Sequence, residues 1–159
     1  MIKQKTFRAS PACNKKGDFL FDQVNFDYDP IQWLDDRRSL RARDASLSEL
    51  DIVRRATKNI QWKWAVGNMP IPNIAESSYC RFVFDKKAKD CFSELIPSPL
   101  FFDIGHGYAL LILDNEPQGV AWRTERGQTI VGEDFFNLYT KCGLSGLQFS
   151  DPSVSPWKK

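Results

Sequence analysis

The sequence predicts an α+β fold in which a mainly antiparallel sheet carries about three helices within a single domain. Three observations support this prediction. The chain has 159 residues, of which 42% are hydrophobic, and this size suits one domain that buries about 68–70% of its unfolded surface. Strand-like and helix-like segments do not alternate regularly, as they would in a doubly wound sheet. Short apolar runs bounded by turn residues are frequent, which is typical of antiparallel strands.

In the N-terminal part, residues 1–79, the first 45 residues are polar, aromatic and irregular, and aromatic residues nearly alternate with polar ones between Phe19 and Tyr28. This alternation predicts one or two short strands. Ser46 and Glu49 fit a capping box, and apolar residues at helical spacing follow them, so we expect a helix over 47–59. A strand is expected over 61–66, with the two tryptophans and Val66 on one face.

In the second part, residues 80–150, the pattern is more regular. A strand over 79–84 leads to a helix over 85–95, for which Asp85 is the expected N-cap. Strands follow over 100–104, 108–113, 119–124 and 128–131. Glu133 or Asp134 opens a last helix, and Gly143 suits the left-handed position just after its end. An extended segment over 144–149 precedes a tail, residues 151–159.

Composition argues against several classes of protein. A net charge of +2 argues against a dedicated nucleic-acid binder, which usually shows a strongly basic stripe. No apolar run approaches the ~20 residues of a membrane span, so we expect no membrane partner. The N-terminus lacks the apolar core of a secretory signal, so a cytoplasmic location is expected. The four cysteines, Cys13, Cys80, Cys91 and Cys142, are far apart, and we expect reduced thiols with neither a metal nor a cofactor.

The one histidine limits catalysis. His106 lies in Gly105-His106-Gly107, which predicts a turn between two strands with an exposed side chain. The alternative is a small enzyme in which His106 acts as a base for a cysteine thiolate or beside a carboxylate. Against a thiolate, Cys91 and Cys142 fall on apolar helix faces, where cysteine usually behaves as a small buried hydrophobe.

Aromatic residues are abundant, with five Trp and 12 Phe. Trp62 and Trp64 share one face of a predicted strand, so they belong either to the core or to a stacking platform that binds a ligand.

A charged segment around residues 27–38 has two interpretations. It is either a solvated surface or a docking patch in which Trp33 is an anchor, since Trp and Arg are favoured at binding hot spots. The candidate partner-binding residues are Asp27, Tyr28, Asp29, Trp33, Asp35, Asp36, Arg37 and Arg38. Asp27 and Asp29 could also share a proton or a cation on one strand face, although a surface pair is the plainer interpretation.

Residues 80–150 resemble a known family. Phe82-Val-Phe-Asp-Lys-Lys-Ala-Lys-Asp-Cys-Phe-Ser-Glu-Leu-Ile96, followed by Leu100-Phe-Phe-Asp-Ile104 and a tyrosine-led strand from Tyr108, is similar to its strand, helix, strand, strand order. Gly143-Leu-Ser-Gly-Leu-Gln-Phe149 after a helix resembles its C-terminal G-(L/I)-(T/S)-G-L-x-F ending. The family is the immunity proteins of bacterial polymorphic toxin systems, of the myxobacterial type.

The resemblance implies a protein that binds a cognate secreted toxin and blocks its active site. It carries no catalytic residue, because its motifs form the fold. The unmatched first half is then expected to determine which toxin is bound.

Overall fold

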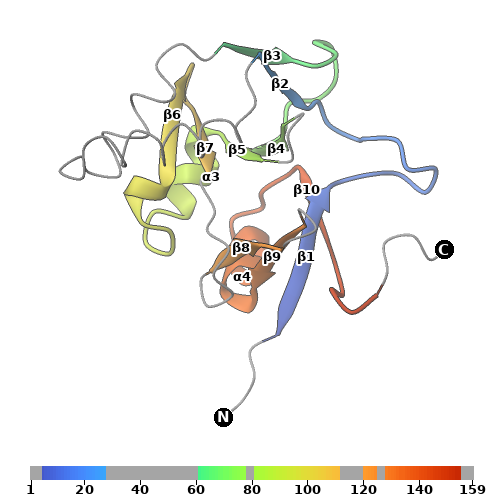
Figure 1. The fold of residues 1–159 in the computed structure, drawn as a ribbon, viewed down its shortest axis with the longest axis vertical. Helices are drawn as coiled ribbons and strands as arrows, with labels where there is room; N and C mark the ends of the chain where they lie inside the picture. The colour runs from blue at the N-terminus through green and yellow to red at the C-terminus, as the bar shows by residue number, and fades with distance from the viewer. Residues whose placement is uncertain (1–4, 28–60, 78–80, 112–119, 125–127, 155–159) are drawn as a thin grey trace, which may run out of the picture.

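The computed structural model describes residues 5–27, 61–77, 81–111, 120–124 and 128–154. Within these residues the protein is a mixed structure of two four-stranded sheets, a two-stranded ribbon and two α-helices (Figure 1). The pairing within all three is antiparallel, as predicted, but the strands form separate sheets rather than one. The helix expected over 47–59 lies outside the described residues.

The first sheet joins the two ends of the chain. Its strand order is β10 (Leu147–Ser150), β1 (Thr6–Pro11), β9 (Thr129–Gly132) and β8 (Ala121–Arg123). Strand β1 was not predicted, although Phe7 and Ala9 alternate with polar residues there. It lies inside the sheet, with Arg8 opposite both Ser150 and Ile130.

The second sheet has the order β4 (Ile74–Glu76), β5 (Phe82–Phe84), β7 (Tyr108–Leu111) and β6 (Phe101–Gly105). A single 3-10 turn, Ser98–Leu100, leads into β6. All three residues of β5 are buried, because this sheet is covered on both faces. A strand that is buried on both faces has a continuous apolar sequence, as Phe82-Val83-Phe84 does.

A ribbon of two strands covers one face of the second sheet. It consists of β2 (Val24–Phe26) and β3 (Trp62–Trp64), and it packs on Ala75, Val83 and Leu110. The predicted strand over 61–66 is therefore shorter than expected. Val66 does not continue the tryptophan face, because its side chain lies in a loop and is 61% exposed.

Helix α3 (Lys86–Cys91) covers the opposite face of the second sheet, and helix α4 (Glu133–Lys141) packs on β9 and β1 of the first sheet. Asp85 is the N-cap of α3, as predicted, since its carboxylate accepts a hydrogen bond from the Ala88 N–H at 2.8 Å. The helix ends at Cys91 rather than near 95, and the chain continues in turns to Ile96. Apolar spacing extends past the helix because these turn residues also enter the core. Gly143 follows α4 with φ of +64°, as its position predicts.

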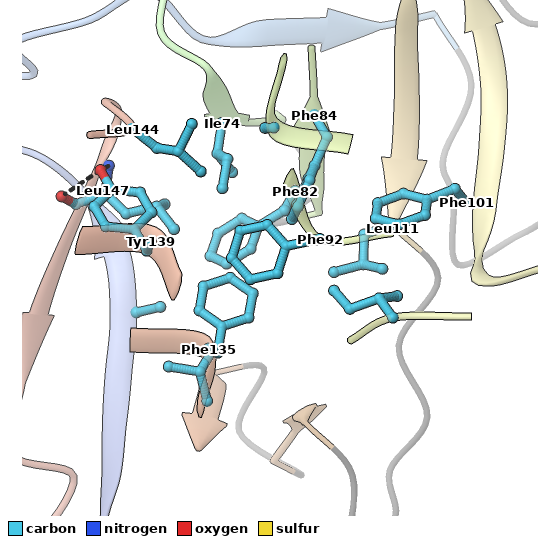
Figure 2. Packing of buried hydrophobic residues seen from close by; sticks show 14 of the residues in the cluster. Ile74, Phe82, Phe84, Phe92, Phe101, Leu111, Phe135, Tyr139, Leu144 and Leu147 are labelled. Atoms are coloured by element: carbon cyan, nitrogen blue, oxygen red, sulfur yellow. Dashed lines mark hydrogen bonds between the residues drawn. The ribbon is translucent and has the colours of Figure 1, made fainter. Parts of the chain in front are cut away.

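The main core lies between the two helices and both sheets (Figure 2). Phe92 of the segment after α3 meets Phe135 of α4 with ring centroids 4.5 Å apart, and Phe84 lies 5.6 Å from Phe92. One turn further along α4, the Tyr139 hydroxyl accepts a hydrogen bond from the Leu147 N–H and donates one to the Leu147 carbonyl. Aromatic packing thus connects the two sheets through the helices.

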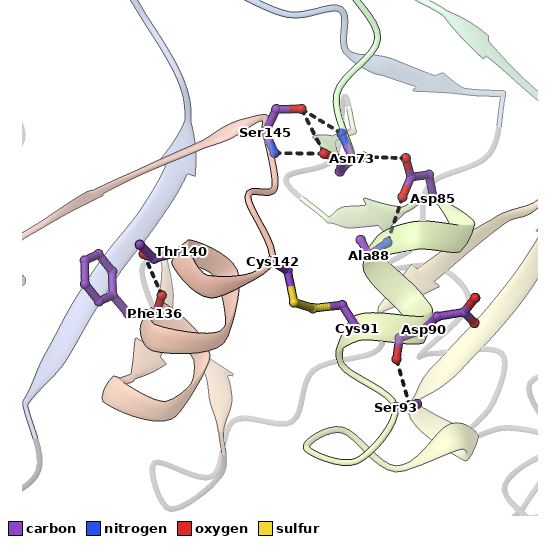
Figure 3. The surroundings of a disulfide bond; sticks show 10 residues. All are labelled: Asn73, Asp85, Ala88, Asp90, Cys91, Ser93, Phe136, Thr140, Cys142 and Ser145. Carbon is purple, nitrogen blue, oxygen red and sulfur yellow. Dashed lines mark hydrogen bonds between the residues drawn. A yellow bond between two sulfur atoms is a disulfide. The ribbon is translucent and has the colours of Figure 1, made fainter.

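The Gly143–Phe149 segment joins α4 to β10, and its residues have structural roles. Ser145 bonds Asn73 through its backbone and side chain, and Asn73 in turn donates to Asp85 at 2.8 Å (Figure 3). At Gly146, φ is +116° and a Cβ would collide with the carbonyl oxygen of Ile74, so only glycine fits. The Gly143–Phe149 segment therefore anchors β10 against the second sheet.

The expectation of four reduced thiols is wrong for two cysteines. Cys91 at the end of α3 and Cys142 at the end of α4 form a disulfide (Figure 3). Their half-buried positions at neighbouring helix ends bring the two sulfur atoms together, which the wide sequence spacing did not indicate. The disulfide therefore joins the helix packed on β5 to the helix packed on β1 and β9.

Candidate functional site

The predicted partner-binding residues fall mostly outside the described part of the chain. Of the eight, the structure describes Asp27, which follows β2 and is exposed. Its carboxylate accepts a hydrogen bond from the Gln61 N–H at 2.9 Å, so it closes the end of the ribbon. The other seven, Tyr28, Asp29, Trp33, Asp35, Asp36, Arg37 and Arg38, lie outside the described residues.

His106 lies where the sequence predicts, in the turn between β6 and β7, with its side chain exposed. It has φ of +58° between Gly105 and Gly107, which have φ of +90° and +81°. A two-residue hairpin turn with two positive φ values is usually filled by Asn-Gly, so histidine is an uncommon choice. The Asp103 carboxylate accepts from the Gly105 N–H at 2.8 Å and supports the turn.

The alternative function, catalysis by a cysteine thiolate with His106, cannot use Cys91 or Cys142, because these two cysteines are bonded to each other. Cys13 is free and half-buried. Burial raises the pKa of the Cys13 thiol, and the nearby charges of Glu76 and Asp18 raise it further, so the thiol is a poor nucleophile. Cys80 lies outside the described residues.

Trp62 and Trp64 both face the second sheet and are half-buried. They meet Tyr108 edge to face, with centroid distances of 5.2 and 5.4 Å, and lie 5.5 Å from each other. The Trp62 indole N–H donates to the Ile104 carbonyl at 2.8 Å. Rings in such direct contact leave no space between them for a ligand. This packing favours the interpretation in which the two tryptophans belong to the core.

Two loops carry an apolar surface that the sequence did not indicate. Four large hydrophobic side chains are about half exposed or more, and we call them the loop face: Phe19 (49%), Leu20 (47%), Val66 (61%) and Ile71 (55%). They come from residues 19–20, before β2, and residues 66–71, after β3. Phe19 and Val66 also line one hollow, and exposed apolar side chains that lie together usually mark an interaction site.

A buried carboxylate holds the two loops together. Asp22 is 1% exposed, and one of its oxygens accepts hydrogen bonds from the N–H groups of Gln23 and Val66, both at 3.0 Å. The other oxygen accepts from the Gly67 N–H at 2.8 Å, and the Asp22 N–H donates to the Pro70 carbonyl. The position of the loop face is therefore fixed by a charge-assisted network.

Beside the loop face lies an open hollow of about 360 Å³. Phe19, Phe21, Val66 and Met69 give it apolar walls, and Gln23, Asn25, Glu76 and Ser77 supply polar groups. Sequence reasoning placed Phe19 and Phe21 in a strand and Val66 on a strand face. Two sequence features could have indicated these exposed loops. Gly67-Asn68 is a turn signal that ends the strand, and Asp22 is a single carboxylate within an aromatic stretch.

The described residues contain no group of three or more His, Cys, Asp or Glu side chains placed to hold a metal ion. Neither of the helices described is long and apolar enough to cross a membrane. In comparisons with known proteins, no family model and no curated protein matches the chain.

Proposed function

We propose that this chain is an immunity protein that binds and neutralises a cognate secreted bacterial toxin by occluding its active site. The loop face carries this proposal, because four of the five exposed large hydrophobic side chains among the described residues lie on it. Apolar side chains held outward by a buried hydrogen-bond network suit a protein-binding surface better than a reaction. The resemblance of residues 80–150 to such immunity proteins is the sequence-based support.

The partner is proposed to be a protein toxin encoded by a neighbouring gene, and neither a nucleic acid nor a membrane. The loop face belongs to residues 1–79, the part of the chain without a family resemblance. This agrees with the expectation that a shared framework presents a variable surface.

Co-expression tests the proposal. The neighbouring gene product, expressed alone, should stop growth, and co-expression of this protein should restore it. The two proteins should also co-purify as a stable complex, measured by size-exclusion chromatography. Growth arrest that this protein does not relieve, without a complex, would exclude the proposed function.

The cytoplasmic location stays a prediction. The disulfide between Cys91 and Cys142 points instead to an oxidising compartment, because disulfides form and persist mainly there. Cell fractionation after alkylation of free thiols separates the alternatives. A cytoplasmic protein should carry alkylated Cys91 and Cys142, whereas a protein recovered outside the cytoplasm should carry the intact disulfide.

A further inference from the structure

The Cys91–Cys142 disulfide lies at the edge of the main core and not inside it. Both cysteines are half-buried, whereas Phe92 and Phe135 of the adjoining core are fully buried. The bond spans the space between the end of α3 and the end of α4 (Figure 3). Disulfides that solvent can reach are the labile and regulatory ones, so the reactivity of this bond is a question of access.

An open hollow of about 440 Å³ leads to one of the two cysteines. Cys91 lines it together with the turns after α3 and one face of α4, and Cys142 does not line it. A sulfur nucleophile that enters the hollow therefore meets Cys91 first. The other lining residues are Glu94, Leu95, Asp134, Asn137, Leu138 and Lys141.

The charged groups at the hollow are of both signs. Glu94 and Asp134 supply carboxylates and Lys141 supplies an ammonium group, and all three side chains are exposed. Exposed charges of opposite sign largely offset each other in water, so an uncharged thiol meets no electrostatic barrier here.

The packing around the disulfide does not depend on the bond. The rings of Phe92 and Phe135 contact each other across the two helices, with centroids 4.5 Å apart, and Asp85 caps α3 through its hydrogen bond to the Ala88 N–H. The same fold is therefore available to the oxidised and the reduced protein. Opening the bond removes only the covalent link between the helices.

We infer that Cys91–Cys142 is a redox modification site, which a dithiol opens in the folded protein by attacking Cys91 from the hollow. This inference goes beyond the proposed function and does not depend on the toxin. The attacking thiolate forms a bond to the Cys91 sulfur, the Cys91–Cys142 bond breaks, and Cys142 leaves as a thiolate that takes a proton from water. The second thiol of the dithiol then displaces Cys91, so the dithiol becomes a disulfide and the protein gains two electrons and two protons.

Reduction kinetics test whether the bond opens in the folded state. The probe is dithiothreitol, an uncharged dithiol, and the protein is the full chain with Cys13→Ser and Cys80→Ser, so that only the disulfide can exchange. The reduction rate should stay within about twofold at all urea concentrations below the unfolding transition, because attack on the folded state exposes little new surface. A rate that rises with urea in parallel with the unfolding equilibrium constant would overturn the inference. Failure of the pair to form in excess oxidised dithiothreitol would overturn it as well.

A matched pair of variants tests the approach through the hollow. Asn137→Trp adds a bulky ring at an exposed position that lines the hollow, and it should slow reduction by about fivefold or more. Thr140→Trp adds the same ring at an exposed position of α4 that does not line the hollow, and its rate should stay within about twofold of the parent. Equal melting temperatures of the oxidised variants show that both are folded. Equal reduction rates for the two variants would overturn the assigned route.

The position of the first adduct tests which sulfur is attacked. Brief exposure to 2-mercaptoethanol, an acid quench and peptide mass spectrometry should locate the mixed disulfide on Cys91 about five times as often as on Cys142, or more. An adduct found mainly on Cys142 would contradict the inference.

Discussion

Reduction of the Cys91–Cys142 disulfide should destabilise the protein markedly. The bond joins residues 51 positions apart, and a crosslink of that separation restricts the unfolded chain by about 4 kcal/mol in the loop-entropy model. With a urea m-value of roughly 2 kcal/mol/M, the unfolding midpoint should fall by about 2 M when the bond is reduced. The fold itself should survive, because Phe92 and Phe135 pack together beside the disulfide.

Urea titrations followed by tryptophan fluorescence, with and without dithiothreitol, measure this shift. Cys91→Ala/Cys142→Ala should behave like the reduced protein and no longer respond to the reductant. Cys13→Ser, which changes the free half-buried cysteine, should keep the full response. A midpoint that is indifferent to the reductant, or a non-reducing digest without a peptide pair linked through these residues, would refute the reasoning.

Three further substitutions test the positions of individual groups. Gly146→Ala should lower the free energy of unfolding by roughly 3 kcal/mol or more, because the new Cβ would meet a backbone carbonyl. Gly143→Ala has open space around its Cβ and should lower the free energy of unfolding by about 1–2 kcal/mol, through its positive φ alone. Chemical denaturation measures both changes. Asp22→Ala should lower the free energy of unfolding by about 3 kcal/mol, because the loop N–H groups lose their acceptor. The variant should also be cleaved faster by proteases between residues 65 and 71. An unchanged cleavage rate would argue against the hydrogen-bond network. Burial raises the pKa of the Tyr139 phenol, so an unfolded tyrosine loses its proton first and the unfolding free energy should fall as pH rises above about 10. Tyr139→Phe should flatten that fall, and an identical slope in both proteins would contradict the assigned burial.

The sequence predicted the elements whose signals are local. Asp85 as an N-cap, Gly143 after the last helix and the exposed turn at His106 each follow from residues within a few positions of one another. The antiparallel pairing was also predicted, because short apolar runs between turns leave little choice.

The missed features depend on residues that are far apart in the chain. The disulfide requires α3 and α4 to end side by side, and their packing is set by the core rather than by the cysteine spacing. Strand β1 was missed because Arg8 and Pro11 make its sequence look irregular, yet its neighbours β9 and β10 come from the far end of the chain.

The loop face illustrates the same limit at the candidate site. Phe19 and Val66 have apolar side chains that pattern reasoning assigns to strands. They are exposed because Asp22 forms hydrogen bonds with the N–H groups of residues more than 40 positions later. A carboxylate inside an aromatic run can be noticed in a sequence, but its partners cannot be identified without the fold.

Hydrogen–deuterium exchange of the free and toxin-bound protein tests the central claim most directly. If the loop face binds the toxin, protection on complex formation should concentrate in residues 19–25 and 63–71, with little change in α3, α4 or the C-terminal segment. A stable complex whose protection lies elsewhere and leaves these two segments unchanged would contradict it.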